Sequence, residues 1–282
     1  MKVIALARAI YLCVVPVDVL AAVISNLHLS SDYNVLALAA PEIAAGTLPG
    51  QFVMVKAGES LDPLLRRPFS VFEVLREHGH TVGISLLSKR IGPSTTRLFE
   101  AKPGDVVQCL GPLGRPFAPV APPDEAWLVA GGVGLAPFLS LAETLRARHV
   151  AVTLYYGARR IAELFYLEAF EHLGVTLVLA TEDGSRGDRG RVTAPLERDL
   201  TARPDHAKVM IYACGPEPML RAVAALSAAH SRPCQVSVER VMGCGIGGCY
   251  SCVIPIAAPG GKWHHVRSCL AGPVFRGDEI AW

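Results

Sequence analysis

Three cysteines lie close together near the C-terminal end of the 282-residue chain, and a fourth follows them. Cys244, Cys249 and Cys252 have the spacing C-x4-C-x2-C, and sixteen residues separate Cys252 from Cys269. This is the plant-type spacing of 2Fe–2S clusters, in which four thiolates converge on two irons. Because three ligands come from one short segment, the chain has to form a tight loop here and bring Cys269 back beside it.

The residues between these cysteines suit such a loop. Gly245, Gly247 and Gly248 lack a Cβ, so the backbone can adopt positive φ and point N–H groups at the sulfurs. A structural zinc site, a disulfide framework and buried apolar cysteines are the alternatives. A zinc ribbon typically has two C-x2-C pairs, and disulfides are disfavoured in a chain without a convincing secretory signal. The spacing therefore favours a 2Fe–2S cluster, with zinc as the main alternative.

The overall composition excludes several classes of function. A net charge of +2 provides no basic field for nucleic acid, and no apolar run reaches the 18 residues of a membrane span. Residues 1–20 are apolar but interrupted by Pro16 and Asp18, and we expect a weakly ordered extension there. Cysteines outside the cluster motif, together with a metal cluster, indicate a reducing compartment, hence the cytoplasm.

Short apolar segments separated by turns dominate residues 21–118. The expected strands are residues 23–25, 33–38, 51–56, 70–73, 81–87 and 105–110. Several short strands at this spacing predict a small antiparallel barrel.

Within this region, Arg67-Pro68-Phe69-Ser70 is similar to the Arg-x-[Tyr/Phe]-[Ser/Thr] signature of ferredoxin-reductase-type flavin domains. Arg67 can hold a pyrophosphate through its planar guanidinium. Phe69 offers a ring face to the flavin, and the Ser70 hydroxyl can reach the isoalloxazine edge. The alternative is an edge-strand arginine beside a core phenylalanine. The glycine-containing loops at residues 92–95 and 111–114 favour the flavin interpretation.

The pattern changes to strand–helix alternation between residues 122 and 230. An apolar strand at residues 126–130 runs into Gly131-Gly132-Val133-Gly134, and a helix begins after Pro137. Such a turn presents bare N–H groups and the positive end of a helix to a phosphate. The alternative is a tight strand–helix turn without a ligand.

The ends of further strands support a nucleotide site for NAD. Asp183 follows the strand at residues 176–180, and Cys214-Gly215-Pro216 follows the strand at residues 208–213. In open α/β sheets, ligands bind outside the carboxyl ends of the strands. Cys214 then lies at the mouth of the site, where ferredoxin-reductase-like proteins use Cys-Gly-Pro to face the nicotinamide. The alternative for Cys214 is a buried thiol before a turn.

Residues 231–282 form the segment that carries the cysteine motif. A strand at residues 235–240 leads into the motif, and residues 252–256 and 263–266 predict a hairpin. His264 and His265 are adjacent, so they project to opposite faces of a strand. We therefore interpret them as ordinary strand residues and not as ligands of a Rieske cluster.

A flavin barrel, a nucleotide domain and a C-terminal cluster loop, in that order, resemble one family: the electron-transfer subunit of type B dihydroorotate dehydrogenase. The resemblance covers about residues 21–282. It implies a mixed β and α/β fold of the ferredoxin-reductase type, with an antiparallel flavin-binding β-barrel, a parallel α/β nucleotide-binding domain and a small C-terminal 2Fe–2S domain. The resemblance is carried by residues 65–70, 111–114, 131–134, 183–185, 239–249, 269 and 272–275.

The resemblance also implies cofactors, partners and an activity. Besides residues 67–70, it places FAD at Leu87, Ser88, Lys89, Ser94 and Thr95. A separate FMN-containing catalytic subunit would oxidise dihydroorotate to orotate in pyrimidine biosynthesis, and its electrons would pass through the cluster and FAD to NAD⁺. The implied complex is a heterotetramer of two subunits of each kind.

Two positions depart from the family pattern. Ser94 stands where the flavin loop usually has a second glycine, and Ala271 stands where an acidic residue is common. These departures bear on the approach of the backbone to FAD and on the cluster potential. The rival interpretations are an FAD/2Fe–2S NAD(P)H–ferredoxin oxidoreductase or sulfhydrogenase-type subunit, a self-contained reductase of a soluble ferredoxin, and a non-enzymatic iron–sulfur scaffold or sensor.

Overall fold

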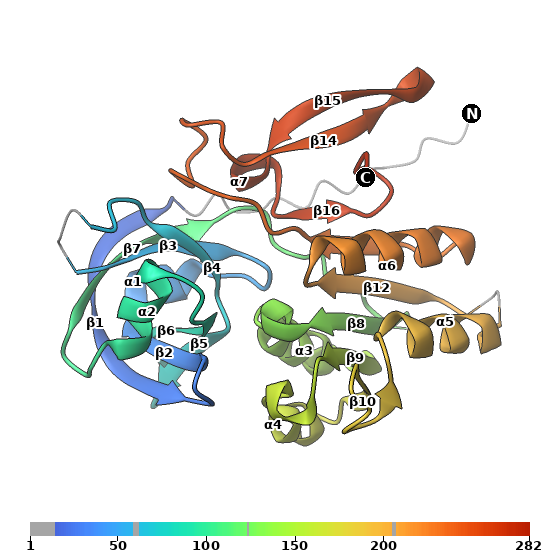
Figure 1. The fold of residues 1–282 in the computed structure, drawn as a ribbon, viewed down its shortest axis with the longest axis horizontal. Helices are drawn as coiled ribbons and strands as arrows, with labels where there is room; N and C mark the ends of the chain where they lie inside the picture. The colour runs from blue at the N-terminus through green and yellow to red at the C-terminus, as the bar shows by residue number, and fades with distance from the viewer. Residues whose placement is uncertain (1–14, 59–61, 123, 205–206) are drawn as a thin grey trace.

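The computed structural model describes residues 15–58, 62–122, 124–204 and 207–282. Two seven-stranded sheets form the body of the molecule, and a two-stranded hairpin lies above them in the view of Figure 1. The barrel on one side and the α/β sheet on the other meet beneath the C-terminal segment, which is drawn in red. Among the described residues, no helix is long and apolar enough to cross a bilayer.

The first sheet is antiparallel throughout. Its strands are β1 (Val17–His28), β2 (Tyr33–Ala39), β3 (Phe52–Ala57), β4 (Arg67–Ser70), β5 (Glu73–Glu77), β6 (His80–Lys89) and β7 (Val106–Leu113), in the spatial order β4-β3-β7-β1-β2-β6-β5. The two ends of this sheet meet because β4 and β5 are consecutive. The Val71 N–H donates to the Gln51 carbonyl before β3, and the Phe72 N–H donates to the Ser85 carbonyl of β6. The sheet therefore curls into a barrel in which the end strands β4 and β5 are joined at this corner but do not pair with each other.

The barrel differs from the sequence expectation at two places. Strand β1 begins at Val17, so the last residues of the predicted extension 1–20 pair with β7, while residues 1–14 lie outside the described residues. The predicted strand at 70–73 is instead the corner between β4 and β5, because the chain changes its pairing partner from β3 to β6 there. The helices α1 (Pro41–Gly46) and α2 (Pro93–Glu100) pack against the barrel.

The second sheet has the order β11-β10-β9-β8-β12-β13-β16 and is parallel except for β16. Residues 126–130 of its central strand β8 are all buried, which is the pattern of a parallel strand covered on both faces. Its elements up to the last helix are β8 (Glu125–Gly131), η1 (Gly132–Leu135), α3 (Phe138–Ala147), β9 (Val152–Ala158), η2 (Ile161–Glu163), α4 (Leu167–His172), β10 (Thr176–Thr181), β11 (Asp188–Arg189), α5 (Thr193–Ala202), β12 (Val209–Cys214) and α6 (Glu217–Ala229).

The cysteine segment is inserted between two strands of this second sheet. Strand β13 (Cys234–Ser237) pairs with β12, and β16 (Val274–Arg276) pairs with β13. Between them lie the hairpin β14 (Val253–Ala258) and β15 (Lys262–Arg267), joined by η3 (Pro259–Gly261), and the short helix α7 (Ser268–Ala271). Of the expected third module at 231–282, the hairpin β14–β15 forms a small sheet of its own, whereas the two outer strands β13 and β16 extend the α/β sheet.

One hydrophobic core joins the barrel to the α/β sheet. Val35, Phe72 and Leu87 of the barrel belong to the same buried cluster as Leu135 and the residues of α3. The Phe72 ring also meets the Tyr166 ring edge-on at 4.7 Å. The relative position of the two units is therefore fixed by close packing and not by a flexible linker.

This shared core predicts that the barrel and the α/β sheet unfold together. Leu135→Ala removes a fully buried side chain and should lower the free energy of unfolding by about 2–5 kcal/mol. Leu20→Ala, at an exposed position of β1, is the matched control and should change it by less than about 0.5 kcal/mol. Calorimetry should show one transition that moves as a unit in Leu135→Ala. Two transitions, of which only one moves, would show that the cores are independent.

Candidate cofactor-binding sites

The cluster loop, residues 243–252, has its backbone N–H groups directed at sulfur. The N–H groups of Gly248 and Cys249 donate to the Cys244 Sγ at 3.2 and 3.4 Å. The Ser251 hydroxyl lies 3.1 Å from the Cys249 Sγ and accepts a hydrogen bond from the Gly243 N–H. Hydrogen bonds to the sulfurs are one of the means by which a protein sets the potential of an iron–sulfur cluster.

The four thiols of the motif lie near one another. The Cys249 thiol interacts with that of Cys244, and the Cys269 thiol interacts with those of Cys252 and Cys244. Within the described ranges, no three or more His, Cys, Asp or Glu side chains converge on a single ion position. A tetrahedral zinc site needs all four ligands around one point, whereas a binuclear cluster takes two thiolates on each iron. The four thiols, with the N–H groups of Gly248 and Cys249 directed at the Cys244 Sγ, are a donor set that fits the expected 2Fe–2S cluster.

Cys249 and Cys269 differ in their electrostatic environment. Hydrogen bonds from the Ser251 hydroxyl and backbone N–H lower the pKa of the exposed Cys249 thiol to about 6. Burial raises the pKa of the Cys269 thiol to about 12. The Cys249 thiol is thus ready to bind metal at neutral pH, while Cys269 gives up its proton only when a cation binds.

Two positions of the cluster loop require glycine, because their φ is positive and because a Cβ would collide with a neighbouring side chain. Gly245 has φ +74°, and a Cβ there would lie 2.4 Å from the Met54 Cγ of strand β3. Gly247 has φ +86°, and its Cβ would lie 2.5 Å from the Leu270 Cδ1. The Arg267 guanidinium holds the loop from the other side by donating to the Gly247 carbonyl at 2.6 Å. The loop is therefore clamped between β3, α7 and the end of β15.

The flavin signature residues lie on β4, next to the strand that supports the cluster loop. Arg67 and Phe69 pair with Val55 and Val53 of β3, so they share a face of the sheet, and Phe69 packs partly against the barrel core. Arg66 forms an ion pair with Asp18, whereas Arg67 takes part in no ion pair among the described residues. Arg67 donates instead to two backbone carbonyls, so its remaining N–H groups suit an anion such as pyrophosphate.

Pro68 and Ser70 occupy the opposite face of β4. They pair with Met54 and Phe52, which pack in one buried cluster with Cys252 and Cys269. Strand β3, which contacts the cluster loop through Met54, is the direct neighbour of β4. Since neighbouring strands lie about 4.8 Å apart, the flavin strand is close to the cluster loop. This closeness between the flavin strand and the cluster loop could not be deduced from the sequence.

The other β6 residues expected to bind FAD differ in how accessible their side chains are. Leu87 and Ser88 of β6 are both buried, although consecutive side chains of a strand point to opposite faces. Lys89 is half-buried, with its Nζ 4.9 Å from the centre of the Tyr33 ring. The Ser85 carbonyl accepts the hydrogen bond from the Phe72 N–H on the side of β6 that faces β5. Backbone groups two residues apart point the same way in a strand, so those of Leu87 and Lys89 face the gap between β6 and β4.

Ser94 and Thr95 lie in the first turn of α2. The Thr95 hydroxyl accepts hydrogen bonds from the N–H groups of Ile91 and Gly92, so it stabilises the start of the helix. Ser94 has ordinary helical geometry. Because no glycine conformation is needed at position 94, the departure from the family pattern costs no backbone strain.

The glycines after β8 have two different roles. A Cβ on Gly134 would lie 2.2 Å from the Cys214 carbonyl oxygen, and one on Gly131 would lie 2.8 Å from the Met219 Sδ. These two residues allow the turns after β8 and β12 to pack together. Gly132 has φ +55°, and a Cβ there would face open space. Gly132 is therefore the residue at which a nucleotide can approach the backbone, whereas Pro137 is buried at the start of α3.

Cys214 ends β12 beside this turn. Burial raises the pKa of its thiol to about 12, and Ser237 of β13 is its hydrogen-bond partner. A neutral thiol at this position cannot act as a nucleophile at neutral pH. Gly215, with φ +155°, packs against Gly131, and Pro216 is exposed. The geometry therefore supports a packing surface for the nicotinamide and no covalent chemistry at sulfur.

The residues that follow the carboxyl ends of β9 and β10, at the outer part of the nucleotide site, are polar. Asp183 follows β10, is fully exposed, and accepts hydrogen bonds from the Ser185 hydroxyl and N–H at 2.6 and 2.9 Å, which lower its pKa. Arg159 and Arg160 follow β9, and the Nε atom of each lies 3.4 Å from a carboxylate oxygen of Glu163. The strand ends expected to bind the nucleotide thus lie along one edge of the sheet.

Several residues of these sites were not singled out from the sequence. Met54 carries no motif, and only the fold shows that it separates β4 from the cluster loop. Ser251 lies inside the C-x2-C motif, so its hydroxyl could have been considered as a hydrogen-bond partner of sulfur. Ser237 and Arg267 are distant in sequence from the groups they bind, and no local signal identifies them.

Comparison with known proteins defines the class first. The family model of the oxidoreductase NAD-binding domain matches residues 128–225, and that of the iron–sulfur cluster binding domain of dihydroorotate dehydrogenase B matches residues 239–281. A solved NADH-dependent reduced ferredoxin–NADP oxidoreductase is similar in structure, with a TM-score of 0.80 and 26% identity over 94% of this chain and 90% of that chain. The expected fold is confirmed: this is an oxidoreductase of the ferredoxin-reductase type, with FAD, NAD and a 2Fe–2S cluster as its cofactors.

Curated relatives then define the family. The electron transfer subunit of dihydroorotate dehydrogenase B (NAD(+)) from Desulforamulus reducens is 39% identical over 86% of this chain and 90% of its own length. The subunit of the same name from Bacillus caldolyticus is 43% identical over 82% of this chain and 86% of its own length. The chain belongs to the family of dihydroorotate dehydrogenase B electron transfer subunits, as its motifs indicated.

The two roles of the glycines predict different effects of the same substitution. Gly132→Ala should leave the fold intact apart from the cost of positive φ, about 1–2 kcal/mol, and should raise the Kd for NADH about tenfold, because a methyl group would enter the open space. Gly134→Ala should instead lower the melting temperature strongly through its clash with Cys214. Equal NADH affinity in Gly132→Ala and the unaltered protein would contradict this assignment.

The two kinds of cysteine also predict a clear difference. Cys249→Ser should abolish or strongly deplete bound iron and acid-labile sulfide, while Cys234→Ser, at a buried position outside the loop, should retain both. The unaltered chain should contain about two irons and two sulfides per molecule. Chemical analysis of the purified proteins provides the measurement. Zinc without labile sulfide in the unaltered chain would contradict the cluster assignment.

Proposed function

We propose that the chain carries electrons between an FMN-containing dihydroorotate dehydrogenase catalytic subunit and NAD⁺. In this proposal, electrons from dihydroorotate oxidation in pyrimidine biosynthesis enter at the cluster loop and leave at the nicotinamide site. The observation that carries the proposal is the order of the three sites. The cluster loop packs on β3, the flavin signature lies on the adjacent β4, and the glycine turn after β8 shares a core with β6 of the same barrel.

Each cofactor has a proposed set of residues in this chain. Bound FAD supplies the exchange between the one-electron chemistry of a cluster and the two-electron chemistry of nicotinamide. In this proposal Arg67 neutralises the pyrophosphate of FAD, and Phe69 and Ser70 position its ring system. Lys89 and the backbone of Leu87 contact the part of FAD between these two groups. Ser94 and Thr95 supply the start of α2. Cys244, Cys249, Cys252 and Cys269 hold the cluster.

The nicotinamide end of the site has to exclude water and orient NAD⁺. We assign the pyrophosphate to the backbone at Gly132 and the start of α3, and the ribose at the outer end to Asp183. Cys214, Gly215 and Pro216 form the surface against which the nicotinamide packs. The Cys214 thiol is neutral and has Ser237 as its hydrogen-bond partner.

The proposal extends to the assembly, the domain division and the compartment. The catalytic subunit docks around Gly243–Tyr250, because electron transfer requires a short gap to the cluster, and the complex contains two subunits of each kind. The functional units are the barrel, which begins with β1 at Val17 and extends to residue 118, the NAD domain at 122–230 and the cluster segment at 231–282. All seven described cysteines are free thiols, which supports a reducing compartment, the cytoplasm.

A reductase acting on a soluble ferredoxin is the second candidate. The structural likeness to a ferredoxin–NADP oxidoreductase over most of both chains favours it. The identity to dihydroorotate dehydrogenase B subunits is higher than to that structure, which favours the first proposal. The two candidates differ in what accepts or donates electrons at the cluster, and this can be measured directly.

The proposal predicts a division of activity between two polypeptides. The chain alone should oxidise NADH with artificial acceptors but should not oxidise dihydroorotate, because that reaction needs a carboxylate pocket and a base beside a second flavin. Mixing with the FMN subunit should create NAD⁺-dependent dihydroorotate oxidation, which Cys249→Ser abolishes and Cys234→Ser preserves. Spectrophotometric assays of NADH formation provide the measurement. Dihydroorotate oxidation by the isolated chain, or by the mixture without a cluster, would contradict the relay.

A further inference from the structure

We propose that Arg267 of β15 raises the reduction potential of the cluster through the peptide group that joins Gly247 to Gly248 in the cluster loop. This inference rests on the proposed function, because it takes Cys244 as one of the cluster ligands. Arg267 is then a positioning residue, since it acts on the cluster through the loop and not as a ligand. A cluster that accepts single electrons from one flavin and passes them to another depends on its potential.

The two ends of this peptide group each carry a hydrogen bond. The Arg267 Nη1 donates to the Gly247 carbonyl oxygen at 2.6 Å. The N–H of the same peptide group belongs to Gly248 and donates to the Cys244 Sγ at 3.2 Å. Because the carbonyl and the N–H of a trans peptide point in opposite directions, the guanidinium, the peptide group and the sulfur form one continuous chain of hydrogen bonds.

A cationic donor on the carbonyl strengthens the hydrogen bond at the other end of the peptide group. Bonds that involve an ionised group are roughly twice as strong as neutral ones, and consecutive hydrogen bonds strengthen one another by about 10–30%. The guanidinium draws electron density towards the Gly247 oxygen, so the Gly248 N–H becomes a better donor. The sulfur ligands become more negative when the cluster takes up an electron. The stronger donor therefore stabilises the reduced cluster more than the oxidised one, which raises the potential.

Gly247 also faces a second cysteine of the motif. Its backbone N–H is a hydrogen-bond partner of the Cys269 thiol, while its carbonyl accepts the bond from Arg267. Its φ of +86° and the Leu270 side chain beside it disfavour any larger residue at this position. Arg267 therefore fixes a residue whose two neighbouring peptide groups point at Cys269 and at Cys244.

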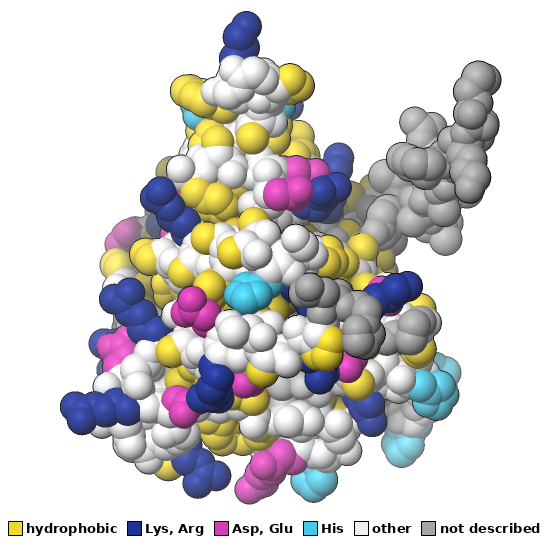
Figure 2. Space-filling model, turned by 90° about the vertical axis from the view of Figure 1, so that its right-hand side faces the viewer, with side chains coloured by type: hydrophobic (Ala, Val, Ile, Leu, Met, Phe, Trp, Pro, Cys, Tyr) yellow, Lys and Arg dark blue, Asp and Glu magenta, His cyan; other side chains and the backbone are white. Residues whose placement is uncertain are grey.

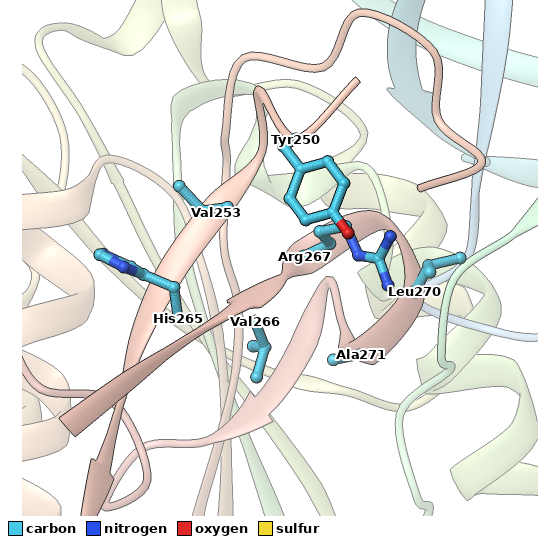
Figure 3. A pocket seen from close by; sticks show the side chains of 7 residues that line it. All are labelled: Tyr250, Val253, His265, Val266, Arg267, Leu270 and Ala271. Atoms are coloured by element: carbon cyan, nitrogen blue, oxygen red, sulfur yellow. The ribbon is translucent and has the colours of Figure 1, made fainter. Parts of the chain in front are cut away.

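The Arg267 side chain is itself held in place by an aromatic ring. Its guanidinium carbon lies 4.6 Å from the centre of the Tyr250 ring, and Figure 3 shows the two groups side by side with Leu270 next to them. In the part of the chain that the structure describes, no carboxylate pairs with Arg267, so its bonds to the carbonyl and the ring leave its charge uncompensated. A planar guanidinium can stack on a ring and donate from its edge at the same time, which an ammonium group cannot do.

The carboxylates that flank the cluster segment are engaged elsewhere. Residues 241–271 contain no Asp or Glu. After this stretch, Asp278 and Glu279 both lie next to the Arg276 guanidinium, at 2.6 and 3.9 Å. Before it, Glu239 acts on the thiol at the end of β12. None of these carboxylates therefore cancels the charge of the guanidinium on the cluster loop.

Lys262 offers a matched control, because it carries the same charge at the other end of β15. It is exposed, and five residues at a rise of about 3.3 Å each place it roughly 16 Å from Arg267. Figure 2 shows a Lys or Arg side chain at the end of the projecting part of the molecule, clear of the rest of the surface. Because exposed charges more than about 8 Å apart are largely screened at physiological ionic strength, Lys262 should not affect the potential.

The test is an anaerobic potentiometric titration of the purified, cofactor-loaded chain, followed by electron paramagnetic resonance of the reduced cluster. At a fixed potential, Arg267→Gln should lower the ratio of reduced to oxidised cluster at least threefold, which is a midpoint about 28 mV lower at about 59 mV per tenfold. Arg267→Lys keeps the charge without the planar fork and should give an intermediate midpoint. Lys262→Gln should match the unaltered chain. Iron and labile sulfide should be normal in all three variants.

The outcomes separate this inference from the function on which it rests. A normal midpoint in Arg267→Gln with normal iron would overturn the inference and leave Arg267 as a clamp of the loop. An equal shift in Lys262→Gln would also overturn it, because the general charge and not the peptide group would then set the potential. If Arg267→Gln loses its iron, Arg267→Lys decides, and a midpoint equal to that of the unaltered chain rejects the inference. Absence of iron and labile sulfide from the unaltered chain would instead contradict the proposed function.

Discussion

Gly245 of the cluster loop lies directly against Met54 of strand β3, and the position of the metal site depends on this contact. A Cβ at Gly245 would lie 2.4 Å from the Met54 side chain, which is fully buried. The loop can therefore approach the barrel only because this residue is glycine with positive φ. Any larger residue would move the four thiols away from β3, and so away from the flavin strand on its other side. Since the rate of electron transfer falls steeply with distance, the close packing of Gly245 on Met54 also determines how fast electrons can pass between the cluster and the flavin.

A second packing constraint holds the nicotinamide end. Gly134 touches the Cys214 carbonyl, and Leu135 immediately after it belongs to the core shared with Phe72 and Leu87 of the barrel. The turn that can accept a nucleotide is thereby fixed relative to β6. The cluster segment is held in the same way, because β13 and β16 on either side of it are strands of the α/β sheet. The three sites thus belong to one packed body (Figure 1).

Sequence reasoning identified the parts that depend on local patterns. The cysteine spacing, the Arg67–Ser70 signature and the glycine turn after β8 each require particular residues at fixed separations, so they are visible in one chain. The sequence could not show that β4 and the cluster loop are separated by Met54, because that depends on strand order. The predicted start of the barrel at residue 21 was too late. Residues Val17–Leu20 belong to β1 and alternate between more and less buried positions, but in the sequence they continue an apolar segment that we interpreted as an extension. The specific side-chain roles in FAD and NAD binding stay predictions.

The central claim is that electrons pass between nicotinamide and the cluster by way of the flavin held on β4. Electron paramagnetic resonance of the cluster during anaerobic reduction by NADH tests this most directly. The flavin-loaded chain should give the signal of a reduced cluster, the flavin-stripped chain should give none, and added FAD should restore it, while a chemical reductant reduces the cluster in both forms. An equal signal with and without flavin would contradict the claim.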